Sequence, residues 1–387
     1  MGFKFVRTAI ATAAAVAAAA SQAATINLID LGGVTGSQAE QGFRIAANYW
    51  GSMFTNNVTI NLGVGFSALG SGIIGSTGSA RQDFSVASWE SGILATRSNS
   101  TLDQTLVLPT LTNGGITGLT VGVDGTGNND TSVTATLNST QNAARTLYLN
   151  TSVVKAVGGT ANYANTNTGG RDGNVTFSSA FSFDFNPTDG ITAGQMDFIG
   201  VAIHEIGHAL GFVSGVDFFD VYGKPNGPSS GTLGYDLNDT SIFSALDMFR
   251  YSAPGQLDFR TGGSKYFSIN GGATALFGNT FSTGRYNGDG QQASHWKDTA
   301  GCQVGNGIMD PTFCFAQMGT ITGLDLAAFD AMGWNLSANA LSVANMTTAQ
   351  IYAAAVPEPS AWALMLAGGV GIAGIARRRA RSTAAQD

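Results

Sequence analysis

Two histidines and a glutamate form the strongest chemical signature of the sequence, at His204-Glu205-Ile206-Gly207-His208. On a helix, residues four positions apart lie on the same face, so both imidazoles can bind one metal ion. The glutamate lies about 100° round the helix, where its carboxylate can take a proton from water at that metal. This HExxH spacing predicts a zinc site with His204 and His208 as ligands and Glu205 as the general base.

The third zinc ligand is identified by counting, because a catalytic zinc takes three protein ligands and leaves one position for water. No glutamate occurs between Glu205 and Glu358, and a serine occupies the position six residues after the second histidine of the motif. His295 is the only other histidine of the chain. The sequence therefore favours His295, and an aspartate between residues 217 and 258 is the alternative.

A methionine turn follows downstream, at Gly307-Ile308-Met309-Asp310-Pro311. The order of HExxH, Gly211, a long insertion, His295 and then Met309 resembles the leishmanolysin-type branch of the metzincin zinc proteases. In that branch an inserted segment displaces the third histidine downstream. The resemblance implies that His204, His208 and His295 bind zinc, that Glu205 is the general base, and that Met309 forms the hydrophobic floor beneath the metal.

Alternation and capping signals predict an α+β fold. Residues 27–33 and 57–66 alternate like strands, and Ser37 has capping-box form ahead of apolar residues at helical spacing. Residues 174–186 also alternate like a strand. This strand is either an edge strand that pairs with an extended substrate or an ordinary core strand.

Two further helices are predicted near the metal site. The first begins after Thr192, carries the HExxH motif and ends before Gly211. Thr322 with Asp325 caps the second helix, which ends before Gly333.

The predicted organisation is one catalytic domain between two processing segments. The metzincin resemblance implies an N-terminal mixed twisted sheet with the active-site helix, and a less regular C-terminal lobe that ends in a helix. The predicted boundaries are a signal peptide at residues 1–23, lobes at residues 24–211 and 212–340, a linker at residues 341–356 and a sorting tail at residues 357–387.

Both ends of the chain carry export signals. Residues 1–23 have a basic start, an alanine-rich stretch and a small-x-small site, which is typical of a secretory signal peptide. Residues 357–387 begin with Pro-Glu-Pro, continue with an uncharged run at residues 360–376 and end with arginines. This arrangement resembles the bacterial PEP-CTERM sorting signal, which implies an exosortase-type partner, transient membrane insertion through residues 360–376 and delivery to the cell envelope or exterior. A permanent single-span anchor is the alternative.

Several other polar residues have candidate roles. Cys302 and Cys314 most simply form one disulfide in an exported protein. Asp197 either orients a zinc ligand or is a polar residue in the first helical turns. Asp247 and Arg250 can form a structural ion pair. Four aspartates are candidate calcium ligands, with simple solvation as the alternative: Asp217, Asp220, Asp236 and Asp239.

Composition narrows the function further. The chain has 387 residues, of which 11% are charged, and a net charge of -7. Its basic clusters lie at the two ends, so we expect no nucleic-acid partner. We expect an exported zinc endopeptidase that hydrolyses proteins or peptides through a zinc-bound water activated by Glu205. The alternatives are a non-catalytic surface or matrix protein with a structural zinc site and a zinc amidase that acts on non-protein substrates.

Overall fold

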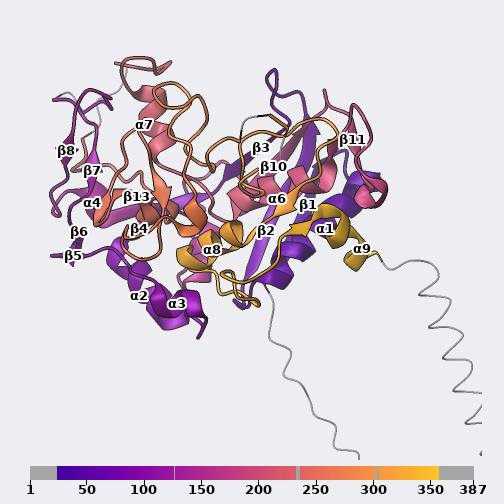
Figure 1. Ribbon diagram of the computed structural model, residues 1–387, viewed down its shortest axis with the longest axis horizontal. Coiled ribbons are helices and arrows are strands. Elements are labelled where there is room, and N and C mark those ends of the chain that lie inside the picture. Colours follow the sequence, from indigo (N-terminus) through magenta and orange to yellow (C-terminus); the bar gives the residue numbers. More distant parts are fainter. Residues whose placement is uncertain (1–23, 126, 232–235, 300, 303–304, 357–387) are drawn as a thin grey trace, which may run out of the picture.

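The computed structural model describes residues 24–356, apart from residues 126, 232–235, 300 and 303–304. The predicted signal peptide at residues 1–23 and the sorting tail at residues 357–387 lie outside the described residues. Figure 1 shows two adjoining parts, with the larger sheet on the right and smaller sheets with short helices on the left. The fold class is α+β, as predicted.

The larger sheet has the strand order β1, β2, β10 and β3. Their bounds are Thr25–Gly32 for β1, Thr59–Ser67 for β2, Gly173–Ser178 for β10 and Gly75–Ser79 for β3. The first three strands run parallel, whereas β3 pairs antiparallel with β10 and forms one edge of the sheet. The strands predicted at residues 27–33 and 57–66 are therefore confirmed.

The strand predicted at residues 174–186 is interrupted. β10 ends at Ser178, and a separate short strand, β11 (Phe183–Asp184), pairs with β12 (Met196–Asp197). β10 lies between β2 and β3, so the alternative of an edge strand at these residues is wrong. The edge belongs to β3, whose sequence Gly-Ser-Thr-Gly-Ser has no alternating apolar pattern that could have predicted it.

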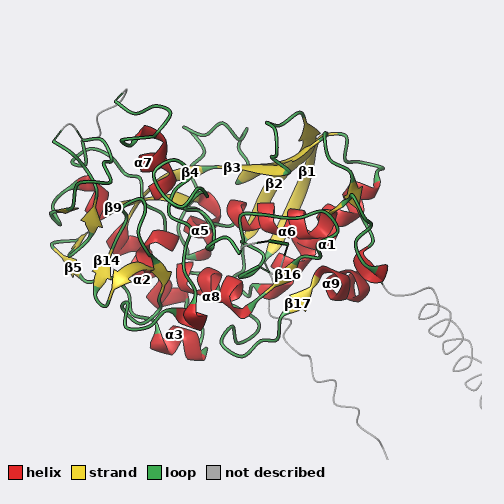
Figure 2. Cartoon of the chain, turned by 45° about the horizontal axis from the view of Figure 1, so that its top comes forward, coloured by secondary structure: helices red, strands yellow, loops and turns green. Residues whose placement is uncertain are grey.

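Two helices pack side by side against this sheet, α1 (Gln38–Met53) and α6 (Phe198–Ala209) (Figure 2). The rings of Phe43 on α1 and Phe198 on α6 meet Phe177 of β10, with centroids 4.7–5.0 Å apart. The indole nitrogen of Trp50 on α1 donates a hydrogen bond of 2.9 Å to the backbone oxygen of Ile203 on α6. Helix α6 is therefore held between the sheet and a second helix, as expected for a helix that is apolar on most of its faces.

The first turn of α1 differs in detail from the prediction. Ser37 occupies the N-cap position, but its hydroxyl donates to the backbone oxygen of Val34 at 2.6 Å. Glu40 accepts a hydrogen bond of 2.8 Å from the backbone nitrogen of Gly36. The helix is present as predicted, whereas the capping box is not formed.

Helix α6 begins later than the sequence predicts, because residues 196–197 are extended in β12. Asp197 is its N-cap, and the carboxylate accepts hydrogen bonds from the backbone nitrogens of Gly200 at 3.0 Å and Gly319 at 2.9 Å. Asp197 therefore caps the helix and does not orient a zinc ligand. The helix stops as predicted at Gly211, which has a left-handed φ of 120°.

The chain on either side of α6 is built from short elements. The helices are α2 (Val86–Thr96), α3 (Thr101–Thr105), α4 (Asn142–Arg145), α5 (Thr151–Ala156) and α7 (Val216–Tyr222), with 3₁₀ helices at Pro187–Asp189, Leu246–Phe249 and Leu276–Gly278. The paired strands are β4 (Arg81–Ser85) with β9 (Thr146–Asn150), β5 (Leu111–Thr112) with β6 (Gly115–Ile116), β7 (Thr120–Val121) with β8 (Ala135–Thr136), and β13 (Arg250–Ala253) between β14 (Gln256–Leu257) and β15 (Tyr266–Phe267).

Helix α8 (Gly323–Met332) has the boundaries that its sequence predicts. The Thr322 hydroxyl accepts from the backbone nitrogen of Asp325, and the Asp325 carboxylate accepts from the backbone nitrogen of Thr322 at 2.8 Å. Gly333 follows the helix with a left-handed φ of 119°. Reciprocal capping at one end and glycine at the other fix this helix.

Residues 346–355, which fall within the predicted linker at residues 341–356, are folded. β17 (Met346–Thr347) pairs with β16 (Thr320–Ile321), and α9 (Thr348–Ala355) follows directly. The Thr348 hydroxyl donates to the Asp197 carboxylate at 2.5 Å. The prediction of a linker is wrong here, because these contacts hold the segment against the start of α6.

A continuous hydrophobic core joins the two parts of the chain. The indole nitrogen of Trp89 donates to the backbone oxygen of Met332 at 3.1 Å, and that of Trp334 donates to Leu210 at 2.9 Å. These bonds tie α2 and the end of α8 to the end of α6. Among the described residues, no helix has the length and apolar character needed to cross a membrane.

Candidate metal centre

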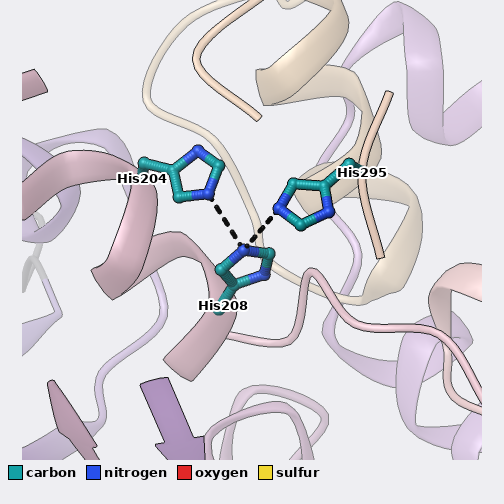
Figure 3. A group of neighbouring side chains, drawn as sticks. All are labelled: His204, His208 and His295. Carbon is teal, nitrogen blue, oxygen red and sulfur yellow. Dashed lines mark hydrogen bonds between the residues drawn. The ribbon is translucent and has the colours of Figure 1, made fainter. Parts of the chain in front are cut away.

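Three histidines from two distant segments meet at one point (Figure 3). His204 and His208 lie one turn apart on α6, and His295 lies in the loop region after β15. The Nε2 atom of His208 is 3.1 Å from that of His204 and 3.2 Å from that of His295. The three residues predicted as one ligand set thus lie together, 87 positions apart along the chain in the case of His208 and His295.

Backbone carbonyls fix the orientation of the three rings. The Nδ1 atom of His204 lies 2.7 Å from the oxygen of Ile308, and that of His208 lies 2.6 Å from the oxygen of Phe212. The third ring directs its Nδ1 atom at the oxygen of Gln292, at 3.3 Å. Since a carbonyl only accepts, each Nδ1 carries the proton and each Nε2 presents a lone pair to the common centre.

Three converging lone pairs are suited to hold a cation between them. Neutral imidazoles with their protons on Nδ1 cannot hydrogen bond to one another through Nε2. Tetrahedral coordination with Zn–N bonds of about 2.0–2.1 Å places neighbouring nitrogens about 3.4 Å apart, close to the two distances observed. The donor set and its geometry therefore fit zinc.

Burial keeps the imidazoles neutral at physiological pH. It lowers the pKa of His204 to about 4 and that of His295 to about 3, and it holds the pKa of His208 well below the usual value. Because a metal binds the deprotonated ring, this shift removes proton competition at neutral pH.

Glu205 lies beside the histidines, with only 6% of its surface exposed. Its Oε2 atom accepts a hydrogen bond of 2.7 Å from the hydroxyl of Thr77 on β3. A Cβ atom on Gly75 would come within 2.6 Å of Oε1, so the carboxylate packs directly against the backbone of that strand. Burial raises the pKa of Glu205 to about 7, which the bond from Thr77 partly opposes. A carboxylate with this pKa can accept and return a proton near neutral pH.

Met309 packs against α6 between the two helical histidines. It is fully buried, and a Cβ atom on Gly207 would come within 2.7 Å of its sulfur. Asp325 holds this turn by accepting hydrogen bonds from the backbone nitrogens of Ile308 at 2.9 Å and Met309 at 3.2 Å. The same carboxylate accepts from the indole nitrogen of Trp296 at 2.9 Å. One buried carboxylate thus joins the methionine turn to the residue after His295.

Asp217 has a structural role beside the third histidine. Its carboxylate accepts from the backbone nitrogens of Ala293 at 2.5 Å and Ser294 at 3.0 Å. The Asp220 carboxylate likewise accepts from backbone nitrogens, at 2.7 and 2.8 Å. These carboxylate oxygens accept from N–H donors, so Asp217 and Asp220 anchor loops. The sequence suggested both as candidate calcium ligands. Among the described residues, the histidine triad is the one cluster whose ligand atoms converge.

Two other predicted pairs are present. Cys302 and Cys314 form a disulfide with Cα atoms 5.5 Å apart, beside the methionine turn. Asp247 and Arg250 form a fully buried ion pair with 3.5 Å between Oδ1 and Nε. The guanidinium also donates to the backbone oxygen of Ser282 at 3.0 Å. Arg250 therefore stabilises the segment that delivers His295.

The three histidines and Glu205 line an open cleft of about 720 Å³. Residues 71–77, which include the first part of β3, form one wall, and residues 310–313 after the methionine turn also line it. The histidine cluster is therefore accessible from solvent through a wide cleft.

Sequence reasoning missed three side chains of this site. Thr77 and Asp325 touch functional residues that are far away in the sequence, and Arg81 lines the cleft from the start of β4. A threonine in a glycine-serine segment and a lone arginine carry no motif. The capping-box position of Asp325 signals a helix start but not its contacts to the methionine turn.

The comparisons with known proteins identify the C-terminal segment. No curated protein and no solved structure matches the chain. Residues 355–381 match the family model of the PEP-CTERM protein-sorting motif. The chain therefore carries the signal of an exported bacterial protein that an exosortase recognises at its C-terminus and that is delivered to the cell envelope or the exterior.

Proposed function

We propose that this protein is an exported zinc-dependent endopeptidase of the leishmanolysin-like metzincin type. The observation that carries the proposal is the convergence of three Nε2 lone pairs beside Glu205 in an open cleft. His204, His208 and His295 would hold the zinc, which supplies Lewis acidity that activates water and polarises the scissile carbonyl. The buried Met309, which packs against Gly207 on α6, would form the floor beneath the metal that the resemblance implies.

The proton chemistry belongs to Glu205. Its carboxylate takes a proton from the attacking water at Oε1, which is the oxygen that Thr77 leaves free, and then returns the proton to the leaving amine. The Thr77 hydroxyl lies within hydrogen-bond distance of Oε2 and of the Glu205 backbone oxygen, at 2.7 and 2.8 Å, and keeps the carboxylate beside β3. A pKa of about 7 suits both directions of transfer, because neither protonation state is strongly favoured near neutral pH.

The edge of the sheet supports an extended polypeptide as substrate. β3 pairs with β10 on one side only, and its residues Gly75, Ser76 and Thr77 line the cleft. Backbone groups at a sheet edge pair with an added strand, so a peptide along β3 would pass directly over Glu205. This favours an endopeptidase over an amidase, because a small non-protein substrate cannot pair along a strand edge.

The three-histidine geometry and the buried Glu205 both argue against a purely structural zinc site. A structural site is closed by four protein ligands, whereas here three histidines converge and the fourth direction opens into the cleft. A surface or matrix protein with a zinc staple would also gain nothing from a buried carboxylate at this position, since burial of an ionisable group costs stability.

The test compares two glutamates that share a pKa raised to about 7 by burial, Glu205 in the cleft and Glu90 on α2. The purified chain with zinc is assayed on casein alongside Glu205→Gln and Glu90→Gln. We expect Glu205→Gln to lose at least about 100-fold in kcat while it keeps its zinc, and Glu90→Gln to match the parent. Equal activity of Glu205→Gln and the parent would refute the proposed mechanism, and absence of casein cleavage by the zinc-loaded parent would refute the endopeptidase.

A further inference from the structure

Arg81 brings an unpaired positive charge to the wall of the metal cleft. It is the first residue of β4, directly after the edge strand, and lines the cleft together with His208. Its side chain is half-buried. Arg81 therefore borders the space in which a substrate would lie.

Among the described arginines that are not exposed, the others have side-chain partners, and Arg81 is different. Arg250 pairs with Asp247, and Arg260 pairs with Asp258 at 2.6 Å. Outside the backbone ladder of β4 and β9, the Arg81 side chain has no hydrogen bond and no ion pair with any described residue. Burial lowers its pKa, and the more distant charges of Tyr148, Asp217 and Asp247 offset this only in part. A partly buried guanidinium without a carboxylate carries an uncompensated desolvation cost.

The two carboxylates whose charges act on Arg81 are already engaged. Asp217 accepts from the backbone of residues 293–294, and Asp247 accepts from the backbone nitrogens of Gly215 at 2.8 Å and Ser244 at 2.9 Å. Turning either toward Arg81 would leave buried N–H groups without an acceptor, which costs more than the new pair gains. The protein itself therefore supplies no partner for this cation.

We propose that Arg81 selects substrates that carry a carboxylate close to the scissile bond. A guanidinium presents a planar fork of N–H donors that matches a carboxylate in two parallel hydrogen bonds. The preferred ligand is an aspartate or glutamate side chain of the polypeptide, and a terminal carboxylate offers the same chemistry. The inference rests on the proposed endopeptidase function and adds its substrate class.

The cleft also offers a control for this selection. A second arginine, Arg285, also lines the cleft, but its side chain is exposed and lies over the ring of Tyr286. An exposed charge is screened by water and discriminates weakly, whereas a half-buried one discriminates strongly. Arg285 therefore serves as the matched control.

The experiment uses pairs of end-blocked peptides that differ only by glutamate or glutamine, at each of the three positions on either side of the cleaved bond. For the zinc-loaded chain, we expect kcat/KM to favour glutamate by about 10- to 100-fold at one of these positions. In Arg81→Gln this ratio should fall to about one, and in Arg285→Gln it should stay within about threefold of the parent. A glutamine peptide with a free C-terminus in the same register tests the terminal carboxylate.

Binding gives a second measurement that does not need turnover. The zinc-loaded Glu205→Gln chain should bind the glutamate peptide about 10-fold more tightly than the glutamine peptide in fluorescence anisotropy, and the added Arg81→Gln change should remove the difference. A parent that cleaves and binds both peptides of every pair equally would overturn the role of Arg81 and leave the peptidase in place. A ratio that survives Arg81→Gln but falls in Arg285→Gln would overturn it too. A parent that binds the peptides but cleaves none would refute the proposed function, and the binding ratio would still decide the role of Arg81.

Discussion

Replacement of Asp325 by asparagine tests how the methionine turn is held. The two carboxylate oxygens accept from the indole nitrogen of Trp296 and from the backbone nitrogens of Ile308, Met309 and Thr322, at 2.8–3.2 Å. The residue has no exposed surface. An amide keeps one of the two acceptor oxygens and turns the other into a donor. At least two buried donors then face an N–H₂ group instead of an oxygen.

The expected loss follows from that count. A buried donor left without an acceptor costs about 1–3 kcal/mol. Two such donors give about 4 kcal/mol, a large fraction of the about 5–15 kcal/mol that stabilises a typical domain. The loosened turn no longer fixes Trp296, the neighbour of His295, so we expect zinc affinity to fall by about 10- to 100-fold.

Urea unfolding followed by tryptophan fluorescence measures the first quantity, and competition with a zinc chelator measures the second. Asp189→Asn is the matched control, because Asp189 is exposed and its side chain accepts no hydrogen bond from a described residue. We expect this control to stay within about 0.5 kcal/mol of the parent. If the unfolding free energy of Asp325→Asn also stays within about 0.5 kcal/mol of the parent and its zinc affinity is unchanged, Asp325 does not hold the turn.

Two other perturbations follow from the structure. A methyl group on Gly75 would lie within 2.6 Å of the Glu205 carboxylate, whereas a Cβ atom on Gly78 of the same strand meets nothing within 4 Å. Gly75→Ala should therefore lower kcat/KM on casein by about 100-fold by displacing the base, and Gly78→Ala by less than about threefold; equal activities would contradict the packing. Burial and the neighbouring Asp103 charge raise the pKa of Asp330 to about 8, far above that of an unfolded aspartate. Between about pH 4 and pH 8 the folded chain therefore binds a proton that the unfolded chain has lost, so stability should fall with rising pH by up to about 1.4 kcal/mol per pH unit. Thermal unfolding from pH 5 to pH 8 should show this slope in the parent and a flatter one in Asp330→Asn, and identical slopes would exclude a proton on Asp330.

The sequence predicts the histidine cluster well because helical spacing and the scarcity of histidine constrain it. His204 and His208 share a helix face at any helix start, so the late start of α6 at Phe198 does not change the result. His295 was found by elimination among three histidines. Helix α8 is equally local, since its capping box and terminal glycine both lie within the segment.

The supporting contacts were not predictable because their partners are distant and chemically ordinary. Thr77 reaches Glu205 across 128 positions, and nothing in its glycine-serine surroundings marks it. The assignment of residues 174–186 to one strand failed because apolar alternation does not show where a strand leaves the sheet. α9 lies within the predicted linker, and the bond from Thr348 that holds it joins the Asp197 cap across 151 positions.

Zinc binding by the purified chain and by His295→Ala tests the central claim most directly. The account predicts one zinc per chain in the parent, and a dissociation constant at least about 100-fold higher in His295→Ala, since two helical histidines alone make an incomplete site. Circular dichroism establishes that the variant is folded, and a Lys297→Ala control, two residues along the same loop, should bind zinc like the parent. A folded His295→Ala chain that retains one zinc with the parent affinity would contradict the three-histidine centre and the function built on it.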